Sequence, residues 1–139
     1  MRRRSFAMLV IGLCLLAPAG GCGGPATATV GGEVTVGGVL LEKGVISFVP
    51  AEGEGAPATA NVVNGRYEIR TTPGNKRVQV SAPVVVGKRP EYNGPNAPMV
   101  EITAEGLPDR YNAKSELTYE VKPGGNTKNW ELEGKLRKP

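Results

Sequence analysis

The chain has 139 residues, with 20 glycines, 12 prolines, two cysteines and no histidine. Its net charge of +4 comes largely from three arginines at positions 2–4, and without them 14 basic groups face 13 acidic ones. A nearly neutral chain without a basic, aromatic-rich cluster is unlike a nucleic-acid-binding protein. The lack of histidine removes the commonest general base and a common zinc ligand, which argues against most hydrolase and metalloenzyme mechanisms.

The N-terminus has the three-part layout of a secretory signal. Residues 2–4 form a basic head, residues 6–17 are almost wholly apolar, and residues 18–21 are Pro, Ala, Gly and Gly. The apolar run has 12 residues, whereas a membrane-spanning helix needs about 20. The pattern therefore predicts a signal peptide over residues 1–21 that is removed, in place of a permanent membrane span.

Cys22 follows this signal directly. The other cysteine, Cys14, lies inside the apolar run and would leave with it, so the processed chain has one thiol and no intrachain disulfide. The segment Ala19-Gly20-Gly21-Cys22 resembles the lipobox of bacterial lipoproteins, although that family usually has Leu where this chain has Ala19. The resemblance implies cleavage between Gly21 and Cys22 and acyl chains on Cys22. An ordinary signal with a cysteine near the mature N-terminus is the alternative.

The lipobox resemblance also implies a location. Two acyl chains suffice for stable membrane anchoring, whereas one is marginal. In lipoproteins of enteric-type Gram-negative bacteria, Asp after the lipidated cysteine marks retention in the inner membrane, and this chain has Gly23 there. The expected location is the cell envelope, with the outer membrane favoured if the host has one and the domain facing the periplasm or the exterior.

Residues 22–28 are expected to form a lipidated tether, and residues 29–136 one all-β domain. Short runs rich in Val, Ile, Thr and Tyr alternate with Gly and Pro turns, and no window keeps the apolar spacing of a helix. This pattern is typical of a sandwich, and it predicts a single antiparallel β-sandwich of about seven strands. The predicted strands cover residues 29–36, 45–49, 58–63, 66–71, 76–86, 117–121 and 127–136, and a shorter one covers 99–104.

Two connections carry distinct signals. Asn64-Gly65 lies between alternating segments and is the strongest short hairpin signal, because both turn positions must tolerate a positive φ. Residues 87–98 contain three prolines and two glycines and are predicted to be a loop. The short basic pairs Lys76-Arg77 and Lys88-Arg89 are predicted to be solvated strand ends or loops.

The order of the segments resembles the transthyretin-like, or carboxypeptidase regulatory-like, β-sandwich, and planctomycete-type lipoproteins carry such domains. The resemblance covers roughly residues 29–133. It rests on Val-Gly-Gly-Glu-Val-Thr-Val (30–36), Gly-Val-Ile-Ser-Phe-Val-Pro (44–50), Val-Asn-Gly-Arg-Tyr-Glu-Ile (63–69), Arg-Val-Gln-Val (77–80), Leu-Pro-Asp-Arg-Tyr-Asn (107–112) and Pro-Gly-Gly-Asn (123–126). It implies an antiparallel sandwich of about seven strands but no single activity, because one fold hosts many functions.

Few residues of the chain combine into a chemical site. Transthyretin-related hydrolases depend on histidines and a C-terminal Tyr-Arg-Gly-Ser, and intradiol dioxygenases hold iron with histidines and tyrosines; this chain has neither set. Glu52 and Glu54 fall in a Gly-rich loop, and Glu131 and Glu133 alternate as on a wet strand face. Asp109 is the only aspartate, whereas calcium sites use clustered carboxylates. We therefore expect no enzymatic activity, no cofactor and no metal.

The aromatic residues divide into two groups. Tyr67, Tyr119 and Trp130 occupy alternating strand positions and are predicted to pack in the core. Tyr92 and Tyr111 fall in loops and are the candidates for contact with a ligand such as a sugar. For Tyr111, capping of the sandwich is the alternative.

Two further hypotheses concern covalent cross-linking and partners. Pilin-type relatives of this fold join Lys to Asn or Asp beside a Glu, and Lys43, Asn129 and Glu68 are candidates for such an isopeptide bond. The leading hypothesis is a non-catalytic envelope lipoprotein that contacts the membrane through acyl chains on Cys22 and has a structural or protein-interaction role. A carbohydrate-binding envelope module is the alternative, followed by a cryptic hydrolase.

Overall fold

The protein is described here from a computed structural model, which places residues 24, 26–53 and 55–138. This part of the chain is all-β, as the alternation predicted, with eleven strands and one 3-10 turn. The elements are β1 (Ala28–Val36), β2 (Val39–Leu40), β3 (Lys43–Pro50), β4 (Ala58–Val63), β5 (Arg66–Thr71), β6 (Gly74–Ser81), β7 (Pro83–Pro90), β8 (Met99–Glu105), η1 (Asp109–Tyr111), β9 (Thr118–Val121), β10 (Gly124–Thr127) and β11 (Trp130–Leu132).

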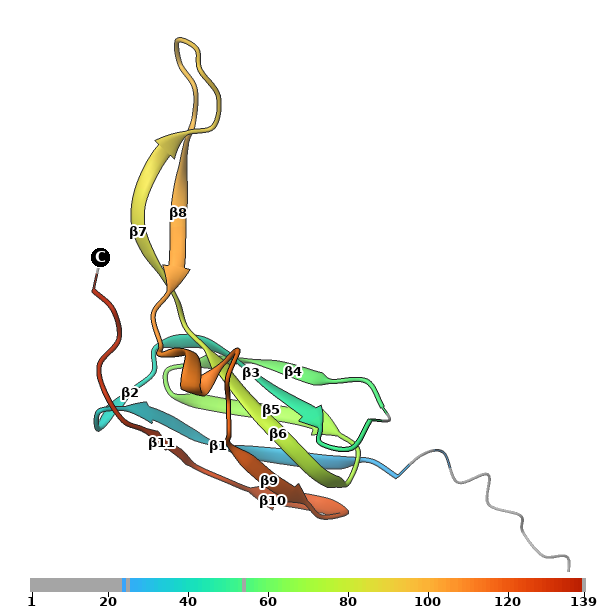
Figure 1. Ribbon diagram of the computed structural model, residues 1–139. Coiled ribbons are helices and arrows are strands. Elements are labelled where there is room, and N and C mark those ends of the chain that lie inside the picture. Colours follow the sequence, from blue (N-terminus) through green and yellow to red (C-terminus); the bar gives the residue numbers. More distant parts are fainter. Residues whose placement is uncertain (1–23, 25, 54, 139) are drawn as a thin grey trace, which may run out of the picture.

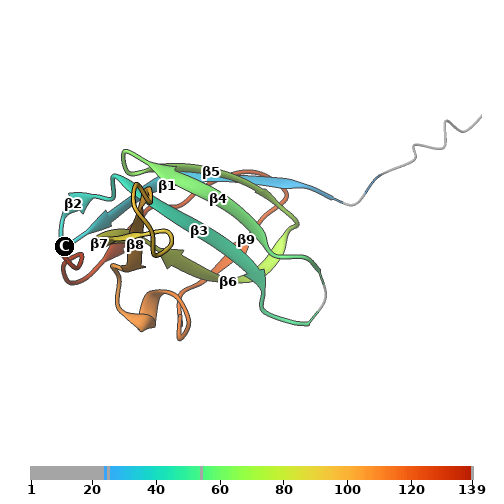
Figure 2. The ribbon, with the colours of Figure 1, turned by 90° about the horizontal axis from the view of Figure 1, so that it is seen from above.

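Nine of these strands form one curled sheet. Its order is β10-β1-β5-β4-β3-β6-β9, and β11 and β2 also pair with β1. β4 and β5 pair only at Val63 and Arg66, beside the Asn64-Gly65 turn, and then separate. Asn64 and Gly65 have φ of 50° and 79°, which confirms the predicted hairpin. Because β4 and β5 diverge, the sheet folds over into two facing groups of strands, β1-β5-β10-β11 and β3-β4-β6-β9, as in a β-sandwich (Figures 1 and 2).

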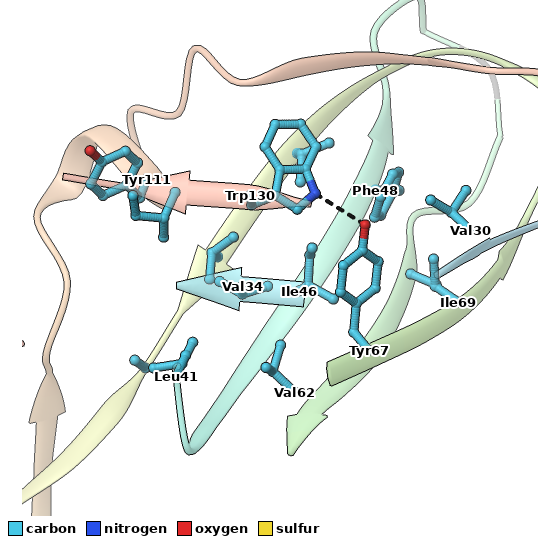
Figure 3. Close-up of a cluster of buried hydrophobic side chains, with 14 of the residues drawn as sticks. Val30, Val34, Leu41, Ile46, Phe48, Val62, Tyr67, Ile69, Tyr111 and Trp130 are labelled. Atoms are coloured by element: carbon cyan, nitrogen blue, oxygen red, sulfur yellow. Dashed lines mark hydrogen bonds between the residues drawn. The ribbon is translucent and has the colours of Figure 1, made fainter. Parts of the chain in front are cut away.

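The core lies between these two groups and contains the inward-facing side chains of their strands (Figure 3). Alternation places every second side chain of a strand on the same face. Val30 and Val34 of β1, Ile46 and Phe48 of β3 and Val78 of β6 are all 0% exposed. The other buried apolar residues are Ala28, Val36, Leu41, Val62, Tyr67, Ile69, Val80, Ala82, Leu107, Tyr111, Val121, Trp130 and Leu132.

The C-terminal strands differ from the expected antiparallel pattern, because β10 and β11 both run parallel to β1 in the same register. Between them the chain crosses closely over Gly32, where a Cβ would lie 1.9 Å from the carbonyl oxygen of Lys128. Lys128 N donates to Gly31 O at 2.9 Å, and Asn129 Oδ1 accepts a hydrogen bond from Glu33 N at 3.0 Å. Glycine is therefore required at position 32, where any side chain would push the last strands away.

The strand predicted over residues 76–86 is divided in the structure. β6 follows β3 as far as Ser81, and β7 then leaves the sandwich to pair with β8 in a separate two-stranded ribbon (Figure 1). The predicted loop over 87–98 is also wrong in its first part, because residues 87–90 belong to β7. Pro83 explains the division, since it has no N–H to continue the ladder with β3. We call residues 83–105 the arm.

Two smaller predictions are corrected near the other end of the sandwich. Lys76 is not solvated: it is 3% exposed in the inward-facing row of β6, and its Nζ donates to Thr72 Oγ1 at 2.8 Å. Ala28, expected in the tether, is the first residue of β1 and is 2% exposed. The folded domain therefore begins one residue earlier than its alternation indicated.

Candidate functional site

The predicted cleavage and lipidation residues, Gly21 and Cys22, lie outside the residues that the structure describes. Cleavage before Cys22 and acylation of its thiol therefore stay predictions. Within the described ranges, no helix has the length and apolar character needed to cross a membrane. The nearest folded element is β1, which begins at Ala28.

Tyr111, one of the two candidate ligand contacts, is part of the body of the sandwich (Figure 3). It ends η1 and is 7% exposed. Its hydroxyl donates to Glu133 O at 3.3 Å and accepts from Glu133 N at 2.8 Å. The guanidinium of Arg110 lies 4.8 Å from the ring centroid. The ring is covered and joins the 107–112 segment to the chain after β11, which is a capping arrangement with no open face for a ligand.

Tyr92, the other candidate, lies in the loop between β7 and β8 at the tip of the arm. It is 55% exposed. Gly94 lies against its ring, since a Cβ there would be 3.2 Å from Tyr92 Cε2. Tyr92 and Tyr111 are therefore in different regions, one at the tip of the arm and one in the sandwich, and they do not form one site.

Two of the three candidates for an isopeptide bond, Glu68 and Asn129, lie in the same region of the surface. Glu68 and Asn129 both line an open hollow of about 780 Å³ on the outside of β1 and β5. Lys43 lies on β3 beside Val63 and is not among the residues that line it. Asn129 already accepts the hydrogen bond from Glu33 N. Its side-chain amide therefore has a structural role beside β1, in the gap between β10 and β11.

Of the three aromatic residues predicted for the core, Tyr67 and Trp130 are confirmed, and Tyr119 is partly buried and packs against the core. Tyr67 and Trp130 are 5% and 6% exposed. Trp130 Nε1 donates to Tyr67 Oη at 3.2 Å, and Tyr67 Oη donates to Lys128 O at 2.6 Å (Figure 3). Burial raises the pKa of Tyr67 to about 12. Both polar atoms are satisfied inside the core, so this group supports the fold and offers no reactive site.

The arm carries most of the exposed apolar side chains. Of eight large hydrophobic residues that are exposed in the described part of the chain, five lie on it: Val85, Val86, Tyr92, Met99 and Ile102. The strand register places Val84 opposite Ala104 and Gly87 opposite Ile102, with a shift at Val86 between them. Opposite residues share a face of a ribbon. One face is therefore mainly apolar, with Val84, Ile102 and Ala104 along it and Arg89 opposite Val100 at the end near the tip.

The other face of the arm is mixed. It presents Val85 opposite Thr103 and Lys88 opposite Glu101. Lys88 Nζ lies 3.8 Å from Glu101 Oε1, and both side chains are more than half exposed. Exposed ion pairs of this kind contribute little to stability. The arm is thus amphipathic, and β7 and β8 pair with no other strand of the described structure.

Glu105 fixes the arm to the sandwich at its root. Its carboxylate accepts hydrogen bonds from Ser81 Oγ, from Ala82 N at 2.8 Å and from Leu107 N at 3.0 Å. Burial raises the pKa of Glu105, but the hydrogen bonds from Ser81 and from backbone N–H groups outweigh it and hold the pKa below its usual range. One charged side chain therefore joins the segments that enter and leave the arm.

Sequence reasoning missed both the arm and the role of Glu105. The signal for the arm was present in two β-branched runs, Val84-Val85-Val86 and Val100-Glu101-Ile102-Thr103, which flank a turn-rich segment. Glu105 had no such signal, because its partners are set by the way the arm leaves the sandwich. Among the described residues, no cluster of three His, Cys, Asp or Glu side chains could hold a metal ion.

No protein-family model matches the chain, and searches of curated proteins and of solved structures return no significant match. The distinctive structural feature of the protein is a sandwich with a well-buried core, from which one amphipathic arm projects (Figure 1).

Proposed function

We propose that the protein is a non-catalytic lipoprotein of the cell envelope whose β-sandwich is an interaction module and whose arm is the contact surface. The observation that carries this proposal is the arm itself, with its exposed Val85, Val86, Met99 and Ile102. Exposed apolar patches of soluble domains commonly mark interaction sites. A ribbon with free edges also offers backbone groups to an added strand.

The position of the arm supports this proposal. β1 begins at one end of the sandwich, and the arm leaves from the opposite end (Figures 1 and 2). Residues 23–27 can span at most about 3.5 Å each, so an anchor at Cys22 would keep the sandwich near the membrane. In that arrangement the arm extends from the end that is remote from the anchor, where a partner can reach it.

The anchor is tested by the intact mass of the protein extracted from membranes with detergent, beside Cys22→Ser. We expect cleavage before Cys22 and the added mass of acyl chains, both lost in Cys22→Ser. A water-soluble, unacylated chain would refute the anchor and leave a secreted sandwich.

The interaction role is tested by cross-linking in intact membranes. Ile102→Ser makes the apolar face of the arm polar, and Val63→Ser is the matched control because Val63 is also exposed, at 57%, but lies on the sandwich. We expect cross-linked species to be lost in Ile102→Ser and kept in Val63→Ser. Equal cross-linking by both variants would contradict a contact through the arm.

A second candidate function is glycan binding at the tip of the arm. It is favoured by the exposed ring of Tyr92, since aromatic rings provide apolar faces for stacking. A glycan array compares the protein with Tyr92→Ala. Binding that is lost in Tyr92→Ala would replace protein contact by glycan contact as the role of the arm.

A further inference from the structure

We propose that β8 of the arm pairs antiparallel with β8 of a second copy of this chain, about a two-fold axis at Ile102. The two arms then form one four-stranded ribbon. This inference deepens the function proposed above by naming the partner of the arm.

The arm is an incomplete sheet. β7 and β8 pair only with each other, and none of residues 83–105 is buried. A two-stranded hairpin is marginally stable in water, and sheets usually need three or more strands with an apolar face. Both outer edges of the arm have backbone groups that no neighbouring strand of the described structure uses.

The two outer edges of the arm differ in how open they are to pairing. β7 begins at Pro83, ends at Pro90 and has a register shift at Val86. Proline and bulges are the devices by which exposed edge strands avoid pairing. β8 contains no proline, and each of its residues from Met99 to Glu105 pairs with β7, so that the extra residue at the shift lies on β7. The edge that is open to strand addition is therefore that of β8.

The sequence of β8 is compatible with pairing to a second β8. With Ile102 on the axis, Val100 lies opposite Ala104 of the partner subunit, and Glu101 lies opposite Thr103 of the partner subunit. Residues directly opposite share a face, so Val100, Ile102 and Ala104 of both copies continue one mainly apolar face, with Arg89 of each arm opposite its own Val100. No two like charges are directly opposite each other. Glu101 also keeps its ion pair with Lys88, at 3.8 Å, within each arm.

Pairing of β8 with β8 also gives a closed dimer. Pairing β7 of one copy with β8 of the next would be head-to-tail and would leave an open edge for further copies, whereas β8 with β8 is two-fold and closes. Anchoring in a membrane would raise the effective concentration of the arms relative to free solution. A second copy of this chain therefore fits the open edge of β8 in its apolar pattern, its charges and its symmetry.

Cysteine cross-linking in membranes carrying the full chain tests the axis. Ile102→Cys places two thiols at the proposed axis, and Val85→Cys is the control, because Val85 has similar exposure (37% against 40%) but lies on β7. We expect mild oxidation to give a disulfide-linked dimer with Ile102→Cys and little or none with Val85→Cys. Equal linkage at both positions, or none at Ile102→Cys, would overturn the pairing.

The register is tested by a charge exchange at Thr103, which the proposal places opposite Glu101 of the partner subunit. Thr103→Lys adds two attractive cross-strand pairs to the dimer, and Thr103→Glu adds two repulsive ones. From the usual size of such pairs we expect the dimer dissociation constant to fall or rise by about 2- to 30-fold. Sedimentation velocity of the detergent-extracted protein measures it, with circular dichroism to show that both variants fold.

These experiments separate the two proposals. If Ile102→Cys forms no dimer while Ile102→Ser still loses a cross-link to another protein, the second copy is refuted and the interaction role stands. If the chain is unacylated but dimerises through β8, the lipid anchor is refuted and the pairing stands. A shift of the dissociation constant in the same direction for both Thr103 variants refutes the register.

Discussion

The sandwich and the arm are built from the same alternating strands but are stabilised in different ways. In the sandwich, alternate residues such as Val30, Ile46 and Phe48 are fully buried between two groups of strands. In the arm, residues 83–105 include no buried residue. Apolar burial contributes roughly 25 cal/mol per Å², so almost all of the hydrophobic stabilisation belongs to the sandwich. The arm depends on its own ladder, on the root at Glu105 and, as proposed, on a partner.

The largest expected effect that separates the two regions is a truncation in the core. Phe48→Ala removes a side chain that is 0% exposed and should lower the free energy of unfolding by about 3–5 kcal/mol. Val86→Ala, on the arm, should change it by less than about 0.5 kcal/mol. Urea denaturation of the two variants measures the contrast. Similar losses in both would mean that the arm is part of the cooperative core.

A smaller effect is expected from the buried hydrogen-bond chain of Tyr67. Tyr67→Phe leaves Trp130 Nε1 and Lys128 O without their partner and should cost about 1–3 kcal/mol. The variant should also change the alkaline limit of the protein. The pKa of Tyr67 is raised to about 12, so the stabilisation is complete below pH 10 and is lost as the pH rises through 12.

Stability measured against pH tests this assignment. The decline of the free energy of unfolding between pH 10 and 12 should be shallower in Tyr67→Phe than in the parent protein. Tyr92→Phe is the control, since Tyr92 is 55% exposed and bonds to nothing in the core. An identical alkaline decline in the parent and in Tyr67→Phe would show that another group governs it.

The smallest effect on global stability, and the most local one, is expected at the root of the arm. Glu105→Gln removes the charge that accepts hydrogen bonds from Ser81 Oγ and from the backbone N–H groups of Ala82 and Leu107. Amide hydrogen exchange should quicken in β7 and β8 while β3 and β6 stay protected. Urea unfolding of the sandwich should be nearly unchanged.

The same root predicts a response to acid. The pKa of Glu105 is held below its usual range in the folded protein, so its contribution is present above the unfolded-state pKa and is lost as the pH falls through the folded-state value. Exchange in the arm should therefore quicken in acid in the parent protein and depend less on pH in Glu105→Gln. Uniform quickening across sandwich and arm would contradict a local clamp.

These regions also differ in how far the sequence predicted them. The inward rows of the sandwich followed from alternation, and the Asn64-Gly65 turn from its φ requirement, because both are local properties. Residues 87–98 of the arm are predicted to be a loop because Pro90, Pro95 and Pro98 gather there, whereas the residues predicted as strand on either side, 83–86 and 99–104, lie in β7 and β8. Proline disfavours central strands, but the outer edges of a two-stranded ribbon tolerate it.

Pairing partners and buried charges were beyond local reasoning. The parallel pairing of β10 and β11 with β1 joins chain segments that are distant in sequence. The close crossing requires a glycine at Gly32, and the local sequence around Gly32 does not indicate this requirement. Lys76 looked solvated because it is charged and next to Arg77. Only the three-dimensional position of Thr72 shows that the ammonium group of Lys76 has a hydrogen-bond partner. Lipidation at Cys22 stays a prediction, as do the partners.

The position of β1 beside the last strands has a consequence for biosynthesis. β1 is the first strand of the domain, and it contacts C-terminal residues that lie far away in sequence. Glu33, for example, is hydrogen-bonded to Asn129, which is 96 positions later. Contacts of such separation slow folding, because the intervening chain must be ordered first. If the chain is exported N-terminus first, as the proposed signal peptide implies, one edge of β1 stays open until residues 124–132 have crossed the membrane. The domain would then complete its fold only after translocation has ended, and a nascent chain stalled before residue 124 would present that open edge to the export machinery and to envelope chaperones.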